Sequence, residues 1–434
     1  MGKTVEILET GLVTPIDDTP KHEIWLSNLD LLVARGHTPT VYFYRPNGDP
    51  NFFSVEALKA ALGKALVPFY PLAGRFVVGP DGRVEIHCTG EGVLFVVARS
   101  ESTVDEFGDF APSTEMRQLL VPSVESGNPP CILVMFQVTF FKCGGVCLGA
   151  AVHHPTADGL GALHFVNSWA EIARGMELAV PPYLDRTLLR ARSPPTVLFD
   201  HVEYSPKPQA KPSSGSKYPF DSAILKLSKN QLNSLKNIGG GKKPLSTFKA
   251  VVAHVWRSAC KARQLSSDQE TRLYMTADAR ARVTPPLPQG YLGNAIFRTS
   301  GVATVGEVLS NSLEFSADKV HGAIVRLNDE FIRSLVDYLE QLEDVRGLHK
   351  GAWVMPGTDL WVISWLGLPI YEADFGWGKP VFMGRACLQF SGLVYIMNNP
   401  GADGSLSLAV ALEPENMPRF KKIFFEDLEA VGGV

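Results

Sequence analysis

The stretch that decides the fold reads VCLGAAVHHPTADGLG and runs from Val146 to Gly161. Its first residues are almost wholly apolar, which predicts a strand from Val146 to His154 that is buried on both faces of a sheet. Pro155 ends this strand because it has no N–H to donate to strand pairing. Beyond Gly161 the apolar residues recur at helical spacing, at Ala162, Phe165, Val166, Trp169, Ile172 and Ala173. The stretch therefore predicts a strand, a turn and a helix, as in an α/β fold.

The turn in this stretch brings two adjacent histidines and an aspartate together. Successive side chains of a strand point to opposite faces, so at most one of His153 and His154 can face a given cavity. A neutral imidazole suits a general base because its ordinary pKa, ~6.5, lies near working pH. The alternative is a buried histidine bonded to backbone, with Asp158 as a plain helix N-cap. We expect no metal site, because adjacent histidines diverge and no Cys or carboxylate has ligand spacing beside them.

Strands and helices are also predicted on both sides of this stretch. Before it, we expect a strand at 41–44, a helix opened by Ser54 and a hairpin around Gly79–Gly82. After it, the patterns predict strands at 223–227, 393–397 and 406–412, a helix capped by Ser246, and a helix over about 324–342.

A proline-rich segment, 181–219, is the natural boundary between the two halves of the chain. It divides the chain into domains at 1–196 and 218–434, with a crossover linker at 197–217. The prediction is two α/β domains of similar size.

Composition narrows the class of protein. The 434 residues include 20% charged residues and carry a net charge of −4, without a long basic run, which disfavours nucleic acid as a partner. No apolar run reaches the ~20 residues that span a membrane, and the start has no signal-peptide pattern. The six cysteines show no CxxC pair, which favours free thiols in the cytoplasm.

A second unusual segment reads DFGWGKP, from Asp374 to Pro380. Two glycines around a tryptophan predict a tight loop, which is either a functional loop or a plain structural turn with a packed Trp377. Other templates fail: the chain has no G-x-S-x-G elbow, and the glycines at 239–241 lack the spacing of a phosphate-binding loop.

Together, the H-x-x-x-D-G motif at His154 and the D-F-G-W-G motif at Asp374 resemble those of the plant BAHD family of coenzyme-A-dependent acyltransferases. The resemblance covers essentially the full length, and within the family it is closest to the hydroxycinnamoyl-CoA transferases of the shikimate/quinate type. Further matching stretches are 37–45, 66–75, 107–112, 185–192 and 285–294. The resemblance implies two chloramphenicol-acetyltransferase-like domains with a channel between them, and a monomer that takes acyl-CoA as a substrate, not a cofactor, together with a small-molecule acceptor.

The resemblance also implies roles for single residues. His154 matches the catalytic base, and Asp158 matches an aspartate that points away from the channel and holds an arginine, for which Arg280 is the candidate. Trp377 matches the second motif, and we expect its indole N–H to stabilise the reaction's oxyanion. Further residues that it implies are Asp374, Gly376 and Gly378 in the second motif, and Thr38 and Tyr42 in the acyl or acceptor pocket.

One position departs from the family pattern. Shikimate- and quinate-using relatives usually carry an arginine where this chain has Gly367, and glycine cannot grip a carboxylate. The expected acceptor is a small molecule with a hydroxyl group, and Gly367 disfavours one that carries a carboxylate, unless another arginine such as Arg385 reaches in. The alternative is an N-acyltransferase that acts on spermidine, an aryl amine or another amine; Glu372 could attract an amine, although a solvated charge is the plainer interpretation.

Overall fold

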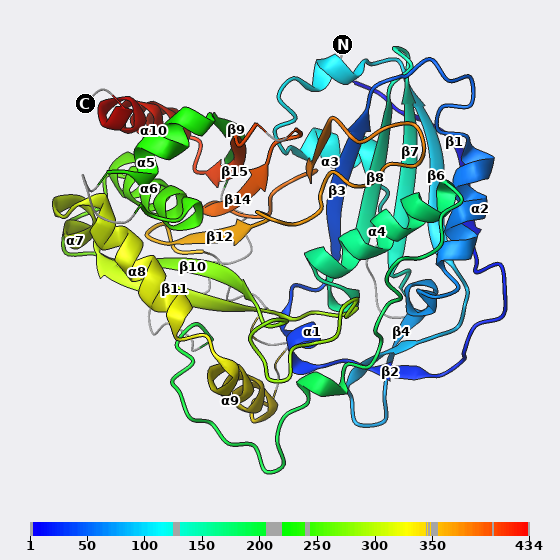
Figure 1. The fold of residues 1–434 in the computed structure, drawn as a ribbon, viewed down its shortest axis with the longest axis horizontal. Helices are drawn as coiled ribbons and strands as arrows, with labels where there is room; N and C mark the ends of the chain where they lie inside the picture. The colour runs from blue at the N-terminus through cyan, green and yellow to red at the C-terminus, as the bar shows by residue number, and fades with distance from the viewer. Residues whose placement is uncertain are drawn as a thin grey trace.

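The structure is a computed structural model that describes residues 3–124, 131–204, 219–238, 244–343, 345, 348, 355–401 and 403–432. Two six-stranded sheets form the centres of the two halves, and a small three-stranded sheet lies beside the first (Figure 1). The glycines at 239–241 and residues 205–217 of the predicted linker lie outside the described residues.

The first sheet has the strand order β1-β6-β7-β8-β3-β13. Its strands are β1 (Glu6–Val13), β6 (Val93–Ser100), β7 (Val134–Phe141), β8 (Val146–His153), β3 (His37–Tyr44) and β13 (Phe382–Arg385). The last of these comes from the second half of the chain and pairs antiparallel with β3. The second half therefore closes one edge of the first sheet, while the predicted domain boundaries stay a prediction.

The second sheet has the order β11-β10-β12-β14-β15-β9. Its strands are β11 (Ile296–Thr304), β10 (Glu270–Asp278), β12 (Leu360–Ser364), β14 (Leu393–Asn398), β15 (Leu406–Leu412) and β9 (Asp221–Leu227). The small sheet consists of β2 (Glu23–Trp25), β5 (Val84–His87) and β4 (Arg75–Val78). The predicted hairpin and the predicted C-terminal strands are thereby confirmed.

Helices cover the sheets (Figure 1). Those of the first half are α1 (Asn28–Leu32), α2 (Val55–Ala65), α3 (Thr114–Leu120) and α4 (Gly159–Ala173). Those of the second half are α5 (Lys229–Lys236), α6 (Thr247–Ala262), α7 (Val305–Ser310), α8 (Leu313–Val325), α9 (Asp329–Glu340) and α10 (Met417–Gly432). Among the described residues, none of the helices combines the length and the apolarity needed to cross a membrane.

The helix predicted over 324–342 is wrong in its boundaries. Val325 still belongs to α8, and α9 begins only at Asp329. The apolar spacing runs on through a residue that starts a new helix. The side chain of Asn328 accepts a hydrogen bond from the N–H of Phe331 at 2.9 Å and so caps the N-terminus of α9. The six cysteines are free, as predicted.

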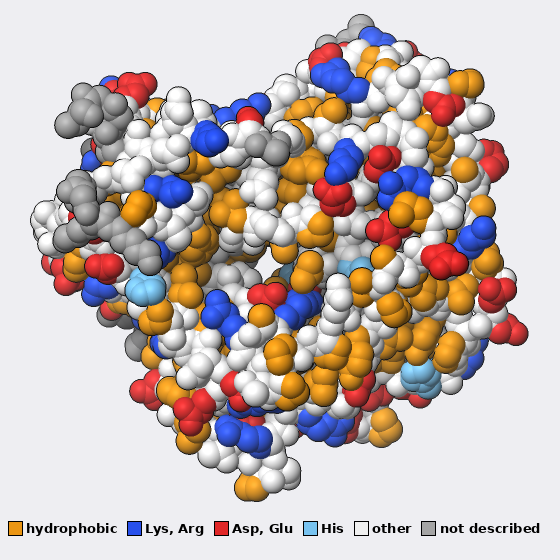
Figure 2. All heavy atoms as spheres, in the orientation of Figure 1, with side chains coloured by type: hydrophobic (Ala, Val, Ile, Leu, Met, Phe, Trp, Pro, Cys, Tyr) orange, Lys and Arg blue, Asp and Glu red, His pale blue; other side chains and the backbone are white. Residues whose placement is uncertain are grey.

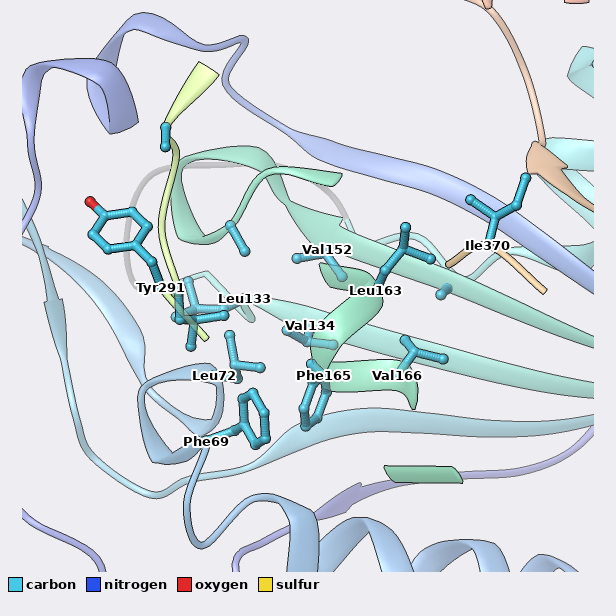
Figure 3. Packing of buried hydrophobic residues seen from close by; sticks show 14 of the residues in the cluster. Phe69, Leu72, Leu133, Val134, Val152, Leu163, Phe165, Val166, Tyr291 and Ile370 are labelled. Atoms are coloured by element: carbon cyan, nitrogen blue, oxygen red, sulfur yellow. The ribbon is translucent and has the colours of Figure 1, made fainter. Parts of the chain in front are cut away.

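The core around α4 joins the two halves. The apolar face of α4 packs on the first sheet, and its Trp169 is fully buried and donates its indole N–H to the Leu58 carbonyl at 3.0 Å. Figure 3 shows Leu163, Phe165 and Val166 of α4 in one cluster with residues of the second half, Tyr291 and Ile370. Because buried apolar contacts cross from one half to the other, the end of β8 is held in place by both.

Candidate active site

A cavity lies where the end of β8 and the start of α4 face the second half of the chain. Figure 2 shows that the surface of the molecule is hollowed between the two halves. The empty space within the cavity, including the solvent at its open side, is about 460 Å³. The first half lines it with Thr38, Thr40, Tyr42, Val152, His154, Ala157, Asp158, Gly159, Ala162 and Leu163, and the second half with Trp365 and Met383.

The two adjacent histidines diverge, as predicted, but the strand ends one residue earlier than expected. β8 stops at His153, and His154 begins a short 3-10 turn in which its N–H donates to the Gly36 carbonyl at 2.9 Å. The ring of His153 packs edge-on against Phe76 and His37, with centroid distances of 4.8 and 5.1 Å. Only His154 lines the cavity.

Asn294 fixes the orientation and tautomer of the His154 ring. The amide nitrogen Nδ2 of Asn294 donates to two acceptors, the Asp30 carboxylate at 3.1 Å and the His154 carbonyl at 2.9 Å. The amide oxygen Oδ1 must therefore be the atom that lies 3.1 Å from His154 Nδ1. A carbonyl oxygen only accepts, so Nδ1 carries the proton. This leaves Nε2 with a free lone pair for a molecule in the cavity.

A buried ion pair supports Asn294 from behind. Asp30 also accepts the backbone N–H of Asn294 at 2.6 Å and lies 3.0 Å from the Arg186 guanidinium. Arg186 donates in turn to the carbonyl of Thr156, in the turn after His154, at 2.7 Å. Both charged side chains are almost completely buried, so the position of the histidine is set by a rigid polar network.

Burial is the largest influence and lowers the pKa of His154; a backbone hydrogen bond opposes it, and the nearby charge of Arg385 lowers the pKa further. The neutral ring is the form that can accept a proton. The histidine is therefore ready to act as a base at neutral pH.

Asp158 holds Arg280, as the resemblance implied, but it also lines the cavity instead of pointing away from it. Its two carboxylate oxygens accept hydrogen bonds from Arg280 at 2.8 and 2.9 Å, and they also accept the backbone N–H groups of Gly161 and Ala295. Burial alone would raise the pKa of Asp158, but the charge and hydrogen bonds of Arg280 bring it below its ordinary value. Asp158 thus caps α4 and joins it to the second half, and the predicted pairing with Arg280 is present.

The second motif does not meet the cavity. Asp374 closes its loop by accepting the N–H groups of Gly376 and Gly378 at 2.8 and 2.9 Å. Trp377 packs on Phe53, whose ring contacts Tyr44.

Tyr44 is at the far end of β3 from the His154 turn, a strand length of about 23 Å at ~3.3 Å per residue. The expectation that the Trp377 indole stabilises the oxyanion is therefore wrong, because the loop packs on the opposite end of the sheet.

The predicted pocket residues Thr38 and Tyr42 do line the cavity, on one face of β3 with Thr40 between them. Gly367 is outside the lining. It has a φ of +78°, and nothing lies within 4 Å of where a Cβ would stand. Trp365, which the sequence did not single out, does line the cavity: its Nε1 lies 3.9 Å from the position of a Cβ on Gly159, the first residue of α4.

Sequence reasoning missed the residues that lie far from His154 along the chain. Asn294, Asp30 and Arg186 surround its turn, yet no spacing rule connects them to it.

Within the described ranges, no group of three or more His, Cys, Asp or Glu side chains could hold a metal ion.

Comparisons with known proteins find relatives along nearly the whole chain. The model of the Transferase family matches residues 3–427. A putrescine hydroxycinnamoyltransferase of Oryza sativa subsp. japonica is 60% identical over 98% of this chain and 99% of its own length. A shikimate O-hydroxycinnamoyltransferase of Nicotiana tabacum is 46% identical over 97% and 99%.

Among solved structures, vinorine synthase matches with a TM-score of 0.75 at 23% identity, over 96% of both chains. This likeness confirms the predicted α/β fold class. The family match over nearly all of the chain and the two plant relatives show that the chain belongs to the Transferase family of BAHD acyltransferases and is an acyltransferase.

Proposed function

We propose that this chain transfers a hydroxycinnamoyl group from its CoA thioester to the hydroxyl or amine of a small acceptor, with His154 as general base. The observation that carries the proposal is the pairing of His154 Nδ1 with Asn294, which leaves Nε2 available in a cavity between the two halves. The hydroxycinnamoyl group is proposed because both relatives are named as hydroxycinnamoyltransferases.

The chemistry needs no covalent enzyme intermediate, because a thioester is already activated. His154 Nε2 removes the proton of the acceptor nucleophile as that atom attacks the thioester carbonyl. The tetrahedral intermediate then collapses, the carbon–sulfur bond breaks, and the imidazolium returns the proton to the departing thiolate. The products are the acylated acceptor and free CoA.

Trp365 takes the role of oxyanion donor in this proposal. It is 8% exposed and lines the same cavity as His154. Within the part of the chain that the structure describes, its indole N–H has no hydrogen-bond acceptor. A donor that faces the reacting carbonyl in a site largely closed to water stabilises the negative charge that develops there.

The nucleophile is the point on which the two relatives differ. The relative at 46% identity is named for the oxygen of shikimate, and the relative at 60% identity is named for the amine putrescine. Both kinds of nucleophile are therefore candidates, and the higher identity favours an amine. A neutral His154 can serve either nucleophile, since both lose one proton during the attack.

The test is release of the CoA thiol from p-coumaroyl-CoA in the presence of shikimate, putrescine or other small alcohols and amines. We expect turnover with at least one acceptor, and a loss of ~10²–10⁴-fold in His154→Ala. We expect Trp365→Phe to lower kcat by ~10²–10³-fold.

The matched control is Trp361→Phe, because the Trp361 indole N–H already donates to Thr276 at 3.0 Å. A wild-type protein that releases no thiol with any acceptor would overturn the proposal. Equal activity of the Trp365 and Trp361 variants would remove Trp365 from it.

A further inference from the structure

Arg385 lies on the cavity-facing side of the first sheet. It is the last residue of β13, and its strand partner on β3 is Thr40. Directly paired residues of an antiparallel ladder point to the same face, as do residues two apart on one strand. Thr40 and Met383, which are related to Arg385 in these two ways, both line the cavity. The arginine side chain therefore leaves the sheet on the side of the acceptor.

This guanidinium is buried, and no carboxylate of the described residues forms an ion pair with it. Arg385 is 2% exposed, and among the described residues its Nε and Nη2 have no hydrogen-bond partner. Its described contact is the ring face of Tyr395, 5.6 Å away. A buried charge is normally paired, because losing water without gaining a partner is costly.

Two carboxylates that the sequence singled out are already paired with other side chains. Asp158, the acid that lines the cavity, is held by Arg280 at 2.8 Å. Glu372, which the sequence offered as an attractor of amines, pairs with Lys379 at 2.6 Å. Arg385 is thus a buried positive charge beside the cavity, and the ion pairs of the described residues do not neutralise it.

Two aromatic rings connect Arg385 with the far wall of the cavity. Tyr395 packs edge-on against Trp365 with a centroid distance of 5.1 Å, and Trp365 lines the cavity. Arg385 is therefore enclosed between the face of β3 and the wall that the second half supplies, next to the space in which the acceptor must meet His154.

We propose that Arg385 is the acceptor-recognition residue of this chain and binds a carboxylate on the acceptor. The inference rests on the proposed function and names the acceptor class: a molecule that carries a hydroxyl or amine for His154 and an acid group for Arg385. A guanidinium offers a fork of N–H donors that fits a carboxylate. In this proposal the carboxylate of the acceptor binds to Arg385, which lies on β13. Gly367 contributes no side chain, although the family pattern usually has an arginine at its position.

The same charge opposes cationic groups. An acceptor with a second ammonium would bring a positive charge towards an unneutralised guanidinium in a poorly hydrated space. Two amines of matched length distinguish a preference for a carboxylate from a preference for an ammonium: 4-aminobutyrate carries a carboxylate where putrescine carries its second ammonium. Shikimate and its methyl ester form the corresponding pair for a hydroxyl nucleophile.

The experiment measures kcat/KM for these four acceptors with p-coumaroyl-CoA, in the wild type and in Arg385→Met. We expect the wild type to prefer the acid member of at least one pair, and Arg385→Met to reduce that preference by about 10- to 100-fold, the range for a hydrogen bond to a charged group. The KM for p-coumaroyl-CoA should stay within about twofold. A rise in that KM alone would show that Arg385 binds a CoA phosphate and would overturn the inference.

Thermal unfolding separates recognition from a structural role. Because methionine replaces an unpaired buried charge by an apolar group of similar length, we expect Arg385→Met to melt no earlier than the wild type. A lower melting temperature combined with an unchanged acid preference would refute the inference. An active wild type that prefers putrescine and the methyl ester would also refute it while leaving the proposed function intact, whereas no turnover at all would refute both.

Discussion

Replacing Asp158 by alanine removes four hydrogen bonds at once. Two of them come from Arg280, at 2.8 and 2.9 Å, and two come from the backbone N–H groups of Gly161 and Ala295, both at 3.0 Å. The Asp158 side chain is completely buried, and that of Arg280 is 13% exposed. The substitution therefore leaves a mostly buried guanidinium without its main counter-charge and a helix without its N-cap.

The magnitude follows from these contacts. Breaking a buried ion pair by removing one partner costs about 3–5 kcal/mol, and losing an aspartate N-cap costs about 1 kcal/mol. Arg280 keeps a weaker contact with Asp278 at 3.3 Å, which limits the loss. We expect the free energy of unfolding to fall by about 4 kcal/mol.

The assay is urea unfolding followed by circular dichroism, combined with thiol release from p-coumaroyl-CoA. The control is His154→Ala, which removes a partly exposed ring and should change the free energy of unfolding by less than about 1.5 kcal/mol. Both variants should lose activity, the first through misplaced structure and the second through the missing base. A double-mutant cycle with Arg280→Met should show a smaller loss in the double variant than the sum of the single losses.

The reasoning fails if Asp158→Ala is inactive but as stable as the wild type. That result would assign Asp158 a direct part in the chemistry. It would also fail if His154→Ala destabilised the protein as strongly as Asp158→Ala, because the histidine would then be a structural residue.

Three further predictions concern protonation and positioning. Asn294→Leu removes the acceptor that holds His154 Nδ1–H, so kcat should fall by about 10²-fold, with a much smaller change in KM; unchanged kcat would contradict the assigned tautomer. The pH profile of kcat/KM should show an acid limb below ~6.5, because burial lowers the pKa of His154 and activity is lost only as pH falls through the lowered value; a midpoint at or above that pH would argue against His154 as the base. Burial lowers the pKa of His254 to about 4, so the unfolded state takes up a proton below pH ~6.5 and stability should fall by up to about 3 kcal/mol between pH 6.5 and 4. His254→Gln, which keeps a donor for the Phe424 carbonyl, should lose less stability over this range than the wild type, and equal urea midpoints at all pH values would contradict this.

The sequence by itself determined the local structure around the site. Apolar spacing predicted β8 and α4, and a polar residue before an apolar helical run predicted the caps at Asp158, Ser54 and Ser246. These features depend on hydrogen bonds and side-chain periodicity within a few residues, so they can be read from neighbours in the chain. The spacing alone left the role of His154 open; its resemblance to a known family predicted it as the base, with Asp158 as its support, and that role stays a prediction.

Only the tertiary structure decided what surrounds the base. Asn294 is 140 residues from His154 in sequence, β13 crosses from the second half into the first sheet, and the glycine-flanked Trp377 packs away from the cavity while Trp365 lines it. No periodicity encodes such contacts, because they arise when two separately patterned halves bury a shared surface. The unpaired charge of Arg385 became visible for the same reason: it depends on which carboxylates the packing brings near, and on which others it leaves bound elsewhere.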